Sequence, residues 1–156
     1  MSAPANANAD QPNDAVVNTR DFAAAPTRLY QAFREPAELA SWWGPRGFTN
    51  TFQKFEFRPG GEWRLTMQAP SGERYENASR FLETTEPSRI VFEHLGPLHW
   101  YRMTITLEPV PRGTRLTWHM RFESPEKCAP LRDFIFTANE ENFDRLSAHL
   151  AREVSA

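Results

Sequence analysis

The feature that most constrains this chain is a series of turn signals between short, aromatic-rich runs. Glycine adopts positive φ at no steric cost and proline presets the first turn position, so each such cluster predicts a chain reversal. The five clusters are Arg58-Pro59-Gly60-Gly61, Pro70-Ser71-Gly72, Glu86-Pro87-Ser88, Gly96-Pro97 and Pro109-Val110-Pro111-Arg112-Gly113. Six strands joined by such tight turns predict an antiparallel meander.

The runs between the turns alternate apolar and polar residues with the period of a strand. The inward set of the last run is the clearest, and it comprises Leu116, Trp118, Met120 and Phe122. In an earlier run the aromatic residues Phe52 and Phe55 fall out of phase, which predicts a β-bulge near Gln53-Lys54. Such a bulge would bend the sheet.

Helical segments flank the meander. Residues 15–22 are predicted to form a first strand, and Pro26 and Pro36 each suit the first turn of a short helix after it. Ser124 is a good N-cap for a long C-terminal helix, which Pro130 interrupts near its start. We expect this helix to cover one face of the sheet, because a sheet with one apolar face must bury it. The fold class is therefore α+β, with about seven strands.

Composition predicts one domain with a tail. Residues 1–14 are mostly Ala, Asn, Pro and Asp, so we interpret them as a disordered tail before a single domain at 15–153. The net charge of −2 comes from Asp10 and Asp14, which leaves a body with 18 basic and 18 acidic residues. A neutral body has no attraction for phosphates, so nucleic acid is not an expected partner. No apolar stretch is long enough to span a membrane.

The remaining chemistry is sparse. The lone cysteine, Cys128, rules out an internal disulfide and fits a cytoplasmic location. The four histidines do not have zinc-site spacing, so we expect neither a metal nor a cofactor. No Gly-x-Ser-x-Gly elbow is present. If the chain is an enzyme, His94 and Glu141 are the candidates for acid–base roles.

Three segments of the sequence together resemble a known family. They are Trp42-Trp43-Gly44-Pro45, Phe55-x-Phe57-Arg58-Pro59-Gly60-Gly61-x-Trp63 and Thr114-x-Leu116-Thr117-Trp118-x-Met120-x-Phe122. They resemble the bacterial branch of the AHSA1-like family (activator of Hsp90 ATPase homologue 1-like), which belongs to the START/Bet v 1-like (SRPBCC) superfamily. The resemblance implies a helix-grip fold, in which a curved antiparallel sheet grips the C-terminal helix around a hydrophobic cavity. Relatives in the superfamily include lipid and polyketide binders, aromatase/cyclases and an Hsp90 co-chaperone.

The inward positions supply the candidate ligand-binding residues. The apolar candidates are Trp63, Met67, Phe81, Phe92, Met103, Trp118, Met120, Phe134, Ala138 and Phe143. The polar candidates are Tyr75, Asn77, Ser79, His94 and Asn142. A buried amide or hydroxyl without a partner is costly, so these polar groups must bind a ligand, water or one another. A purely structural network among them is the competing interpretation.

These residues predict a binding protein for a hydrophobic small molecule, either aromatic or lipid-like. One alternative is a cyclase- or hydrolase-type enzyme that uses the same cavity. Another is an interaction protein that modulates a chaperone of the Hsp90 type, which would need an exposed apolar patch. The sequence leaves open whether the chain forms a homodimer.

Overall fold

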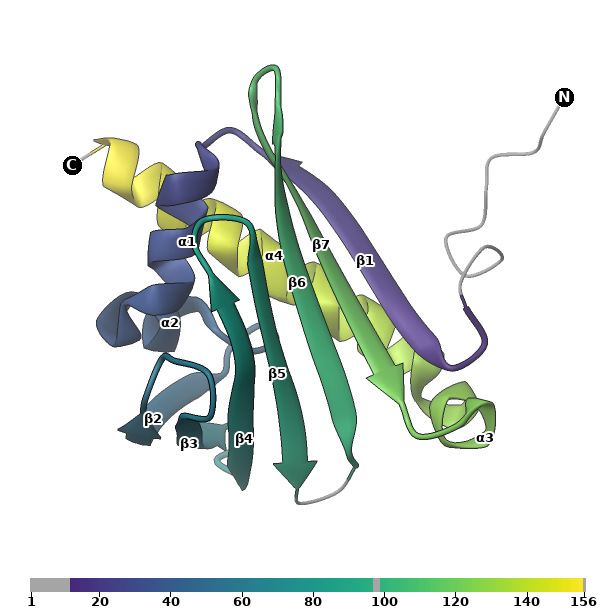
Figure 1. Cartoon of the computed structure of the whole chain (residues 1–156). Helices are drawn as coiled ribbons and strands as arrows, with labels where there is room; N and C mark the ends of the chain where they lie inside the picture. The colour runs from purple at the N-terminus through teal and green to yellow at the C-terminus, as the bar shows by residue number, and fades with distance from the viewer. Residues whose placement is uncertain (1–11, 97–98, 156) are drawn as a thin grey trace, which may run out of the picture.

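The computed structural model of the protein describes residues 12–96 and 99–155. A seven-stranded antiparallel sheet carries a long helix across one face (Figure 1). The strands are β1 (Ala15–Phe22), β2 (Thr49–Phe55), β3 (Glu62–Gln68), β4 (Arg74–Thr85), β5 (Arg89–Gly96), β6 (Tyr101–Val110) and β7 (Gly113–Phe122). The helices are α1 (Pro26–Arg34), α2 (Pro36–Trp42), α3 (Pro125–Cys128), the 3₁₀ turn η1 (Ala129–Leu131) and α4 (Arg132–Ser155).

The strand order is β1-β7-β6-β5-β4-β3-β2, and every neighbouring pair is antiparallel. Strands β2 to β7 therefore form the predicted meander, and β1 pairs with β7 at its edge. The predicted turn at Gly96-Pro97 falls partly on residues 97–98, which lie outside the described residues. The seven-stranded helix-grip fold expected from the sequence is confirmed.

Irregular pairing bends the sheet at three places. The register of β2 against β3 shifts between Phe52 and Lys54, which confirms the predicted bulge. Two further shifts lie in β4 against β5, between Ala78 and Ser79 and again after Phe81. Bulges increase the local bend and twist of a strand. The alternation of residue types had not indicated these last two.

The helix boundaries follow local signals in the sequence. Pro26 and Pro36 occupy the first turns of α1 and α2, where the missing N–H costs nothing. The Ser124 hydroxyl accepts a hydrogen bond from the Lys127 N–H at 3.2 Å and caps α3. Pro130 lies in η1, so the regular helix begins at Arg132, after the interruption that the sequence predicted.

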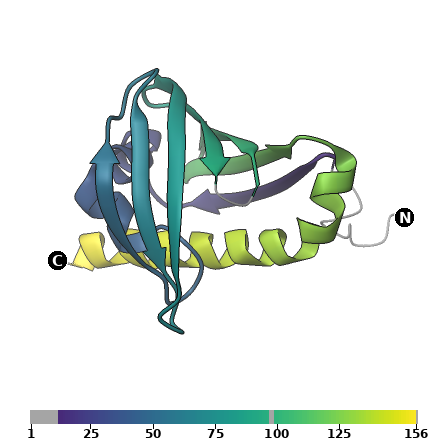
Figure 2. The ribbon, with the colours of Figure 1, turned by 90° about the horizontal axis from the view of Figure 1, so that it is seen from below.

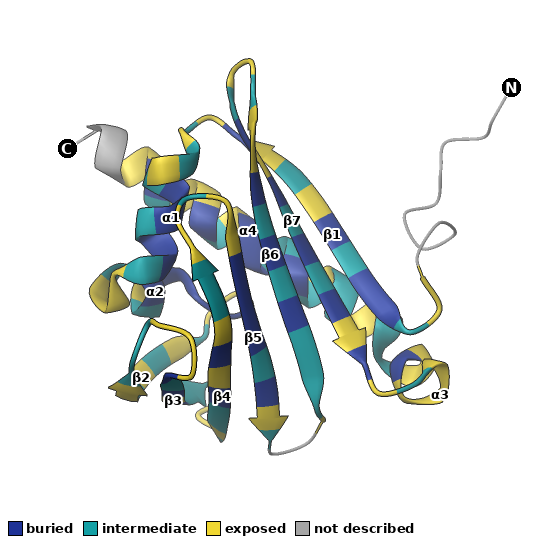
Figure 3. Ribbon diagram, in the orientation of Figure 1, coloured by how far each residue is buried: buried dark blue, intermediate teal, exposed yellow. Residues whose placement is uncertain are grey.

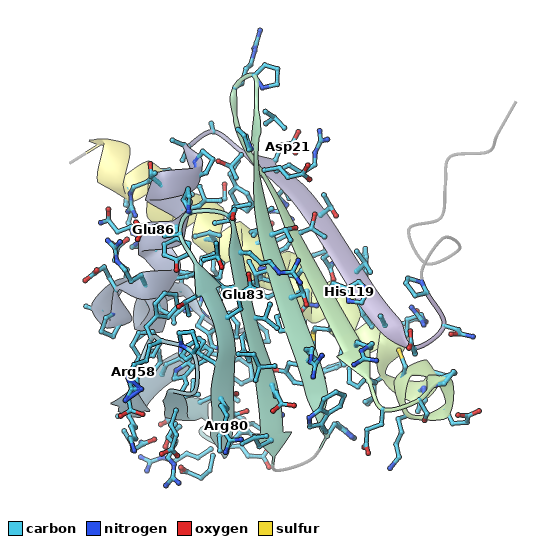
Figure 4. All side chains as sticks on the ribbon, viewed as in Figure 1. Asp21, Arg58, Arg80, Glu83, Glu86 and His119 are labelled. Carbon is cyan, nitrogen blue, oxygen red and sulfur yellow. The ribbon has the colours of Figure 1, made fainter. Side chains whose placement is uncertain are left out.

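Helix α4 runs across the concave face of the sheet (Figure 2). Buried and exposed residues alternate along the strands, as expected for a sheet with one covered face (Figure 3). Arg80, Glu83 and His119 lie on the side of the sheet that faces away from α4 (Figure 4). The chemistry of the concave side is therefore the part of the structure from which function has to be argued.

The predicted tail, residues 1–14, lies outside the described residues as far as residue 11. Residues 12–14 form a turn that is bonded to the domain. The Phe122 N–H donates to the Asp14 carbonyl at 2.8 Å, and the Arg132 guanidinium donates to the Pro12 carbonyl at 2.7 Å. Residues 12–14 therefore contact the domain, and the predicted division into tail and domain stays a prediction.

A polar cluster joins α1, α2 and α4. The Glu38 carboxylate accepts hydrogen bonds from Arg28 at 2.8 Å, Gln31 at 2.9 Å and His149 at 2.8 Å. Burial opposes ionisation of Glu38, but these three hydrogen bonds outweigh it and lower the pKa of the carboxyl group. The cluster fixes the short helices against α4, at one end of the concave face.

The tight turn before β3 gives a direct test of the fold. A Cβ at Gly61 would overlap the carbonyl oxygen of Glu56, whereas a Cβ at Gly96 would meet open space. We expect Gly61→Ala to lower the free energy of unfolding by about 1–3 kcal/mol, because the turn must open to relieve the overlap. Gly96→Ala is the matched control and should be nearly neutral. Urea unfolding followed by circular dichroism measures both, and equal stabilities would contradict this description of the turn.

Candidate functional site

A cavity of about 120 Å³ lies between the concave face of the sheet, α4 and the loop that follows α2. Strands β3 to β7 supply its wall, Asn139 and Asn142 reach it from α4, and residues 43–45 close it from the loop. Its position matches the space that we expected between sheet and helix, and its use as a binding cavity stays a prediction. Its size is closer to one ring than to a lipid chain.

Aromatic rings form much of the cavity wall, and Trp43 lies at their centre. Its ring centroid is 5.0 Å from that of Trp63, 5.2 Å from Trp118 and 6.1 Å from Phe92. All three contacts are edge-to-face or tilted, the arrangements that aromatic quadrupoles favour. Trp43 is 8% exposed, so it packs into the interior instead of standing open as a lid. A ligand in the cavity would contact this cluster.

Asn142 on α4 binds the backbone of the loop after α2. Its side-chain oxygen accepts from the Gly44 N–H at 3.1 Å, and its NH₂ donates to the Trp42 carbonyl at 3.0 Å. Gly44 has φ +99°, a conformation that favours glycine. The amide that we predicted to orient a ligand is thus bonded on both sides to the protein. Asn142 lines the cavity, but its amide group is used to hold the loop in place.

Arg145, one turn further along α4, reinforces this attachment. Its guanidinium donates to the carbonyls of Ser41, Trp43, Gly44 and Pro45 at 2.9–3.2 Å. Burial and the charge of Arg152 lower the pKa of Arg145, because no carboxylate shares its hydrogen bonds. The two α4 side chains together fix the position of Trp43 over the cavity.

A polar row crosses the opposite wall. Ser79 pairs with Trp63 on one side and with His94 on the other, and His94 pairs with Tyr101. Directly paired residues have Cβ atoms about 5 Å apart, so the four side chains are neighbours on the concave face. The rings of His94 and Tyr101 stack, with centroids 4.7 Å apart and planes at 10°.

The two ring nitrogens of His94 lie against oxygen atoms of the protein. Its Nδ1 donates to the His99 carbonyl at 2.8 Å, and its Nε2 lies 2.8 Å from the side-chain oxygen of Asn77. The ring is 7% exposed. Burial lowers the pKa of His94, although the His99 carbonyl opposes this shift. Both nitrogens have partners within the protein, which leaves neither of them free for a ligand.

Several polar groups on the cavity-lining residues have no partner. The hydroxyls of Ser79 and Tyr101 take part in no hydrogen bond within residues 12–96 and 99–155. Ser79 is only 4% exposed, and burial raises the pKa of Tyr101. The buried indole N–H groups of Trp63 and Trp118 also have no acceptor. Buried N–H groups without an acceptor are rare in native interiors, whereas the two hydroxyls are not among the fully buried unpaired atoms of the described residues.

Ten of the fifteen predicted site residues line the cavity. The apolar members are Trp63, Met67, Phe92, Met103, Trp118 and Met120. The polar members are Asn77, Ser79, His94 and Asn142. That they bind a ligand stays a prediction.

The other five predicted residues lie elsewhere. Phe134 is 74% exposed and Ala138 is half-buried, so neither contributes to the wall. Phe143 is buried but packs against Trp118 and Phe22, on the far side of the cavity wall. Phe81 stacks behind Trp63 at 5.8 Å, which separates it from the cavity. The Tyr75 hydroxyl donates to Glu73 at 2.6 Å at the surface.

Six lining residues were not among the predicted site residues, and these are Trp43, Gly44, Pro45, Leu65, Tyr101 and Asn139. Leu65 and Tyr101 are on inward strand positions, so the alternation that identified their neighbours identifies them as well. The loop residues had no periodic signal. Asn139 donates to the Asn18 side chain at 3.1 Å and to Met120 Sδ at 3.3 Å.

Other candidate chemistry lies away from the cavity. Glu141 accepts from the Arg46 N–H at 3.1 Å near the surface and does not line the cavity with His94. Cys128 is buried, and burial raises the pKa of its thiol. Among the described residues, no group of three His, Cys, Asp or Glu side chains could hold a metal ion. None of the described helices is both long and apolar enough to cross a membrane.

Comparison with known proteins identifies the family. The family model described as "Activator of Hsp90 ATPase homolog 1-like protein" matches residues 23–151, and the chain belongs to this family. No curated protein matches the chain significantly.

Solved structures show the same fold. A protein from Nitrosomonas europaea is 21% identical with a TM-score of 0.84, and the match covers 94% of this chain and 99% of that one. A Rhodobacter sphaeroides protein is 28% identical with a TM-score of 0.82, over 92% and 95% of the two chains. The AHSA1 protein from Silicibacter pomeroyi is 23% identical with a TM-score of 0.74, over 89% and 99%.

The attachment of the loop by Arg145 can be tested by mutation. Arg145→Met removes the hydrogen bonds to four carbonyls, and we expect it to lower the free energy of unfolding by about 1–3 kcal/mol. The tryptophan fluorescence of the protein should also change, because the surroundings of Trp43 change when the loop is no longer held. Arg46→Met is the control, because Arg46 is an exposed arginine whose ion pair with Asp144 spans 4.0 Å. If both variants unfold at the same urea concentration, the carbonyl contacts do not hold the loop.

The burial of His94 predicts a pH dependence of stability. The pKa of His94 is lower in the folded than in the unfolded state, so the unfolded chain binds more protons as the pH falls. The contribution of His94 to the free energy of unfolding is fully present above the ordinary histidine pKa of about 6.5. As the pH falls below that value, the contribution decreases by at most about 1.4 kcal/mol per pH unit.

The measurement is urea unfolding of the wild type and of His94→Gln between pH 7.5 and 5.5. We expect the wild type to lose more stability than the variant over this range. A parallel decline in the two proteins would mean that His94 does not titrate as a buried group.

Proposed function

We propose that this protein binds a hydrophobic small molecule in the cavity between the sheet and α4. The observation that carries the proposal is the cavity of about 120 Å³, bounded by Trp43, Trp63, Phe92 and Trp118. An engineered apolar cavity of about 150 Å³ in another protein stays dry and binds benzene, so a void of this order can hold a ligand. Burial of the ligand's apolar surface would supply the affinity.

The polar row supports the same proposal. The Ser79 and Tyr101 hydroxyls lie on lining residues and have no partner in the described part of the chain. Binding pockets typically combine apolar walls with a few polar groups that orient the ligand. The structural-network interpretation accounts for Asn142 and His94, whose hydrogen bonds are internal, but not for these two hydroxyls.

The fold itself suits a ligand-binding domain in general, since a curved sheet and one helix enclose an interior space. Specific partners do not follow from family membership. A chaperone contact would need an exposed apolar patch, and the exposed large apolar residues among those described are Leu82, Leu95 and Phe134, on three different elements. The enzyme alternative would need two acid–base groups in one cavity. His94 lines the cavity and Glu141 does not, so the two side chains do not share a site.

We also propose a cytoplasmic location. Cys128 is buried and forms no disulfide, which is consistent with it.

A ligand screen tests the proposal. Neutral hydrophobic compounds that bind should quench the tryptophan fluorescence and raise Tm. At a ligand concentration one hundred times Kd, binding stabilises by about 2.7 kcal/mol, which corresponds to roughly 5–10 °C for a chain of this length.

The control is a variant in which the cavity is filled. In Ser79→Leu, a larger apolar side chain occupies part of the void, and the response to ligands should disappear while the circular dichroism spectrum is retained. If no compound from a broad neutral library changes Tm or fluorescence in the wild type, the proposal fails.

A further inference from the structure

We propose that the ligand is an uncharged molecule with a single aromatic ring and one oxygen acceptor, such as a phenol or an aromatic aldehyde. This rests on the proposed function and makes it more specific. The argument uses the volume of the cavity, the absence of charge in its lining and the kind of polar atoms left without partners. Each of these properties excludes a different class of hydrophobic ligand.

The volume limits the ligand to one ring. The cavity encloses about 120 Å³, slightly less than the roughly 150 Å³ of the engineered cavity that accommodates benzene. Pockets for larger ligands are typically about 300–1,000 Å³. A fused bicycle or an acyl chain would have to extend beyond this space or displace wall residues such as Trp43 and Trp63, which are 8% and 2% exposed and pack edge-to-face. Displacement of close-packed rings is costly.

The lining excludes an ionised ligand. None of the described residues that line the cavity is an aspartate, glutamate, lysine or arginine. His94 titrates there, but burial lowers its pKa and so favours the neutral ring. A carboxylate or ammonium group would therefore lose its hydration without gaining an opposite charge, which costs far more than its apolar contacts return. Benzoate is excluded by this argument and phenol is not.

The polar atoms select for oxygen. The hydroxyls of the lining residues Ser79 and Tyr101 have no hydrogen bond in the described part of the chain, whereas the indole N–H groups of Trp63 and Trp118 are buried away from the cavity surface. Each hydroxyl can donate a hydrogen bond to a ligand oxygen. Ser79 lies between Trp63 and His94 on the concave face, so a ligand oxygen near Ser79 would also approach the polar row. A hydroxyl or carbonyl oxygen can accept from such donors, whereas benzene leaves them unpaired.

The rings around the cavity complement an aromatic ligand. Trp43 contacts Trp63 and Phe92 edge-to-face, and these contacts leave ring faces and edges at several orientations around one space. An aromatic ring can enter such a cluster with the edge-to-face geometry that the cluster already uses. Met67, Met103 and Met120 line other parts of the wall, and their flexible thioethers adapt to small differences in ligand shape.

The test compares a series of probes by isothermal titration calorimetry and by the Tm shift of the full chain. The probes are phenol, benzaldehyde, benzene, sodium benzoate, 2-naphthol and decanoate. We expect phenol and benzaldehyde to bind about two- to tenfold more tightly than benzene, the effect of one hydrogen bond. Benzoate, 2-naphthol and decanoate should bind at least tenfold more weakly than phenol.

Two variants test the oxygen site. Ser79→Ala and Tyr101→Phe each remove a hydroxyl and should weaken phenol binding about two- to tenfold while leaving benzene binding unchanged. Tyr75→Phe is the matched control, because the Tyr75 hydroxyl donates to Glu73 outside the cavity. It should bind every probe as the wild type does. If Tyr101→Phe is poorly folded, Ser79→Ala alone decides the outcome.

The outcomes separate this inference from the function on which it rests. If no probe binds, the proposed function fails and the inference fails with it. If 2-naphthol or decanoate binds as tightly as phenol, or benzoate does, the cavity binds ligands but the assigned class is wrong. If phenol binds but neither hydroxyl variant changes its affinity relative to benzene, the oxygen site is not at Ser79 or Tyr101, and the inference is overturned.

Discussion

The width of the concave face constrains the rest of the structure. Seven strands spaced about 4.8 Å apart extend over roughly 29 Å, whereas a helix with its side chains is about 10–12 Å across. Helix α4 therefore covers only part of the face, and other groups must cover the remainder. Helices α1 and α2 cover one end, and aromatic side chains fill most of the space between. The cavity of about 120 Å³ is what they leave.

The cavity is maintained by polar contacts at its edge. Asn142 and Arg145 bind the backbone of the loop after α2, and this loop carries Trp43. Because the loop is bonded to α4, Trp43 has a fixed position against Trp63 and Trp118 and does not collapse further into the void. The polar residues nearest the helix thus support the shape of the site. The hydroxyls of Ser79 and Tyr101 on the strand side are the groups that we propose for ligand binding.

The sequence predicted the strands, the first bulge and most of the cavity wall, because strand alternation assigns each side chain to a face. On α4, where a helix face is set by an angle, it placed Asn142 at the cavity but also included Phe134 and Ala138, which do not line it. The centre of the buried face is at Asn139. At about 100° per residue, Phe134 lies roughly 140° from that centre and Ala138 roughly 100°, which explains their exposure. Trp43 could not be assigned, because a loop has no periodicity and its position depends on Arg145, a hundred residues away.

The central claim is that genuine empty space separates the sheet from α4, and diffraction from a xenon-pressurised crystal measures this directly. Xenon binds in small apolar voids without needing a hydrogen bond. The account predicts xenon density among the side chains of Trp63, Met103 and Trp118. The account would be contradicted if these three side chains were in direct contact with one another and no xenon lay between them at saturating pressure.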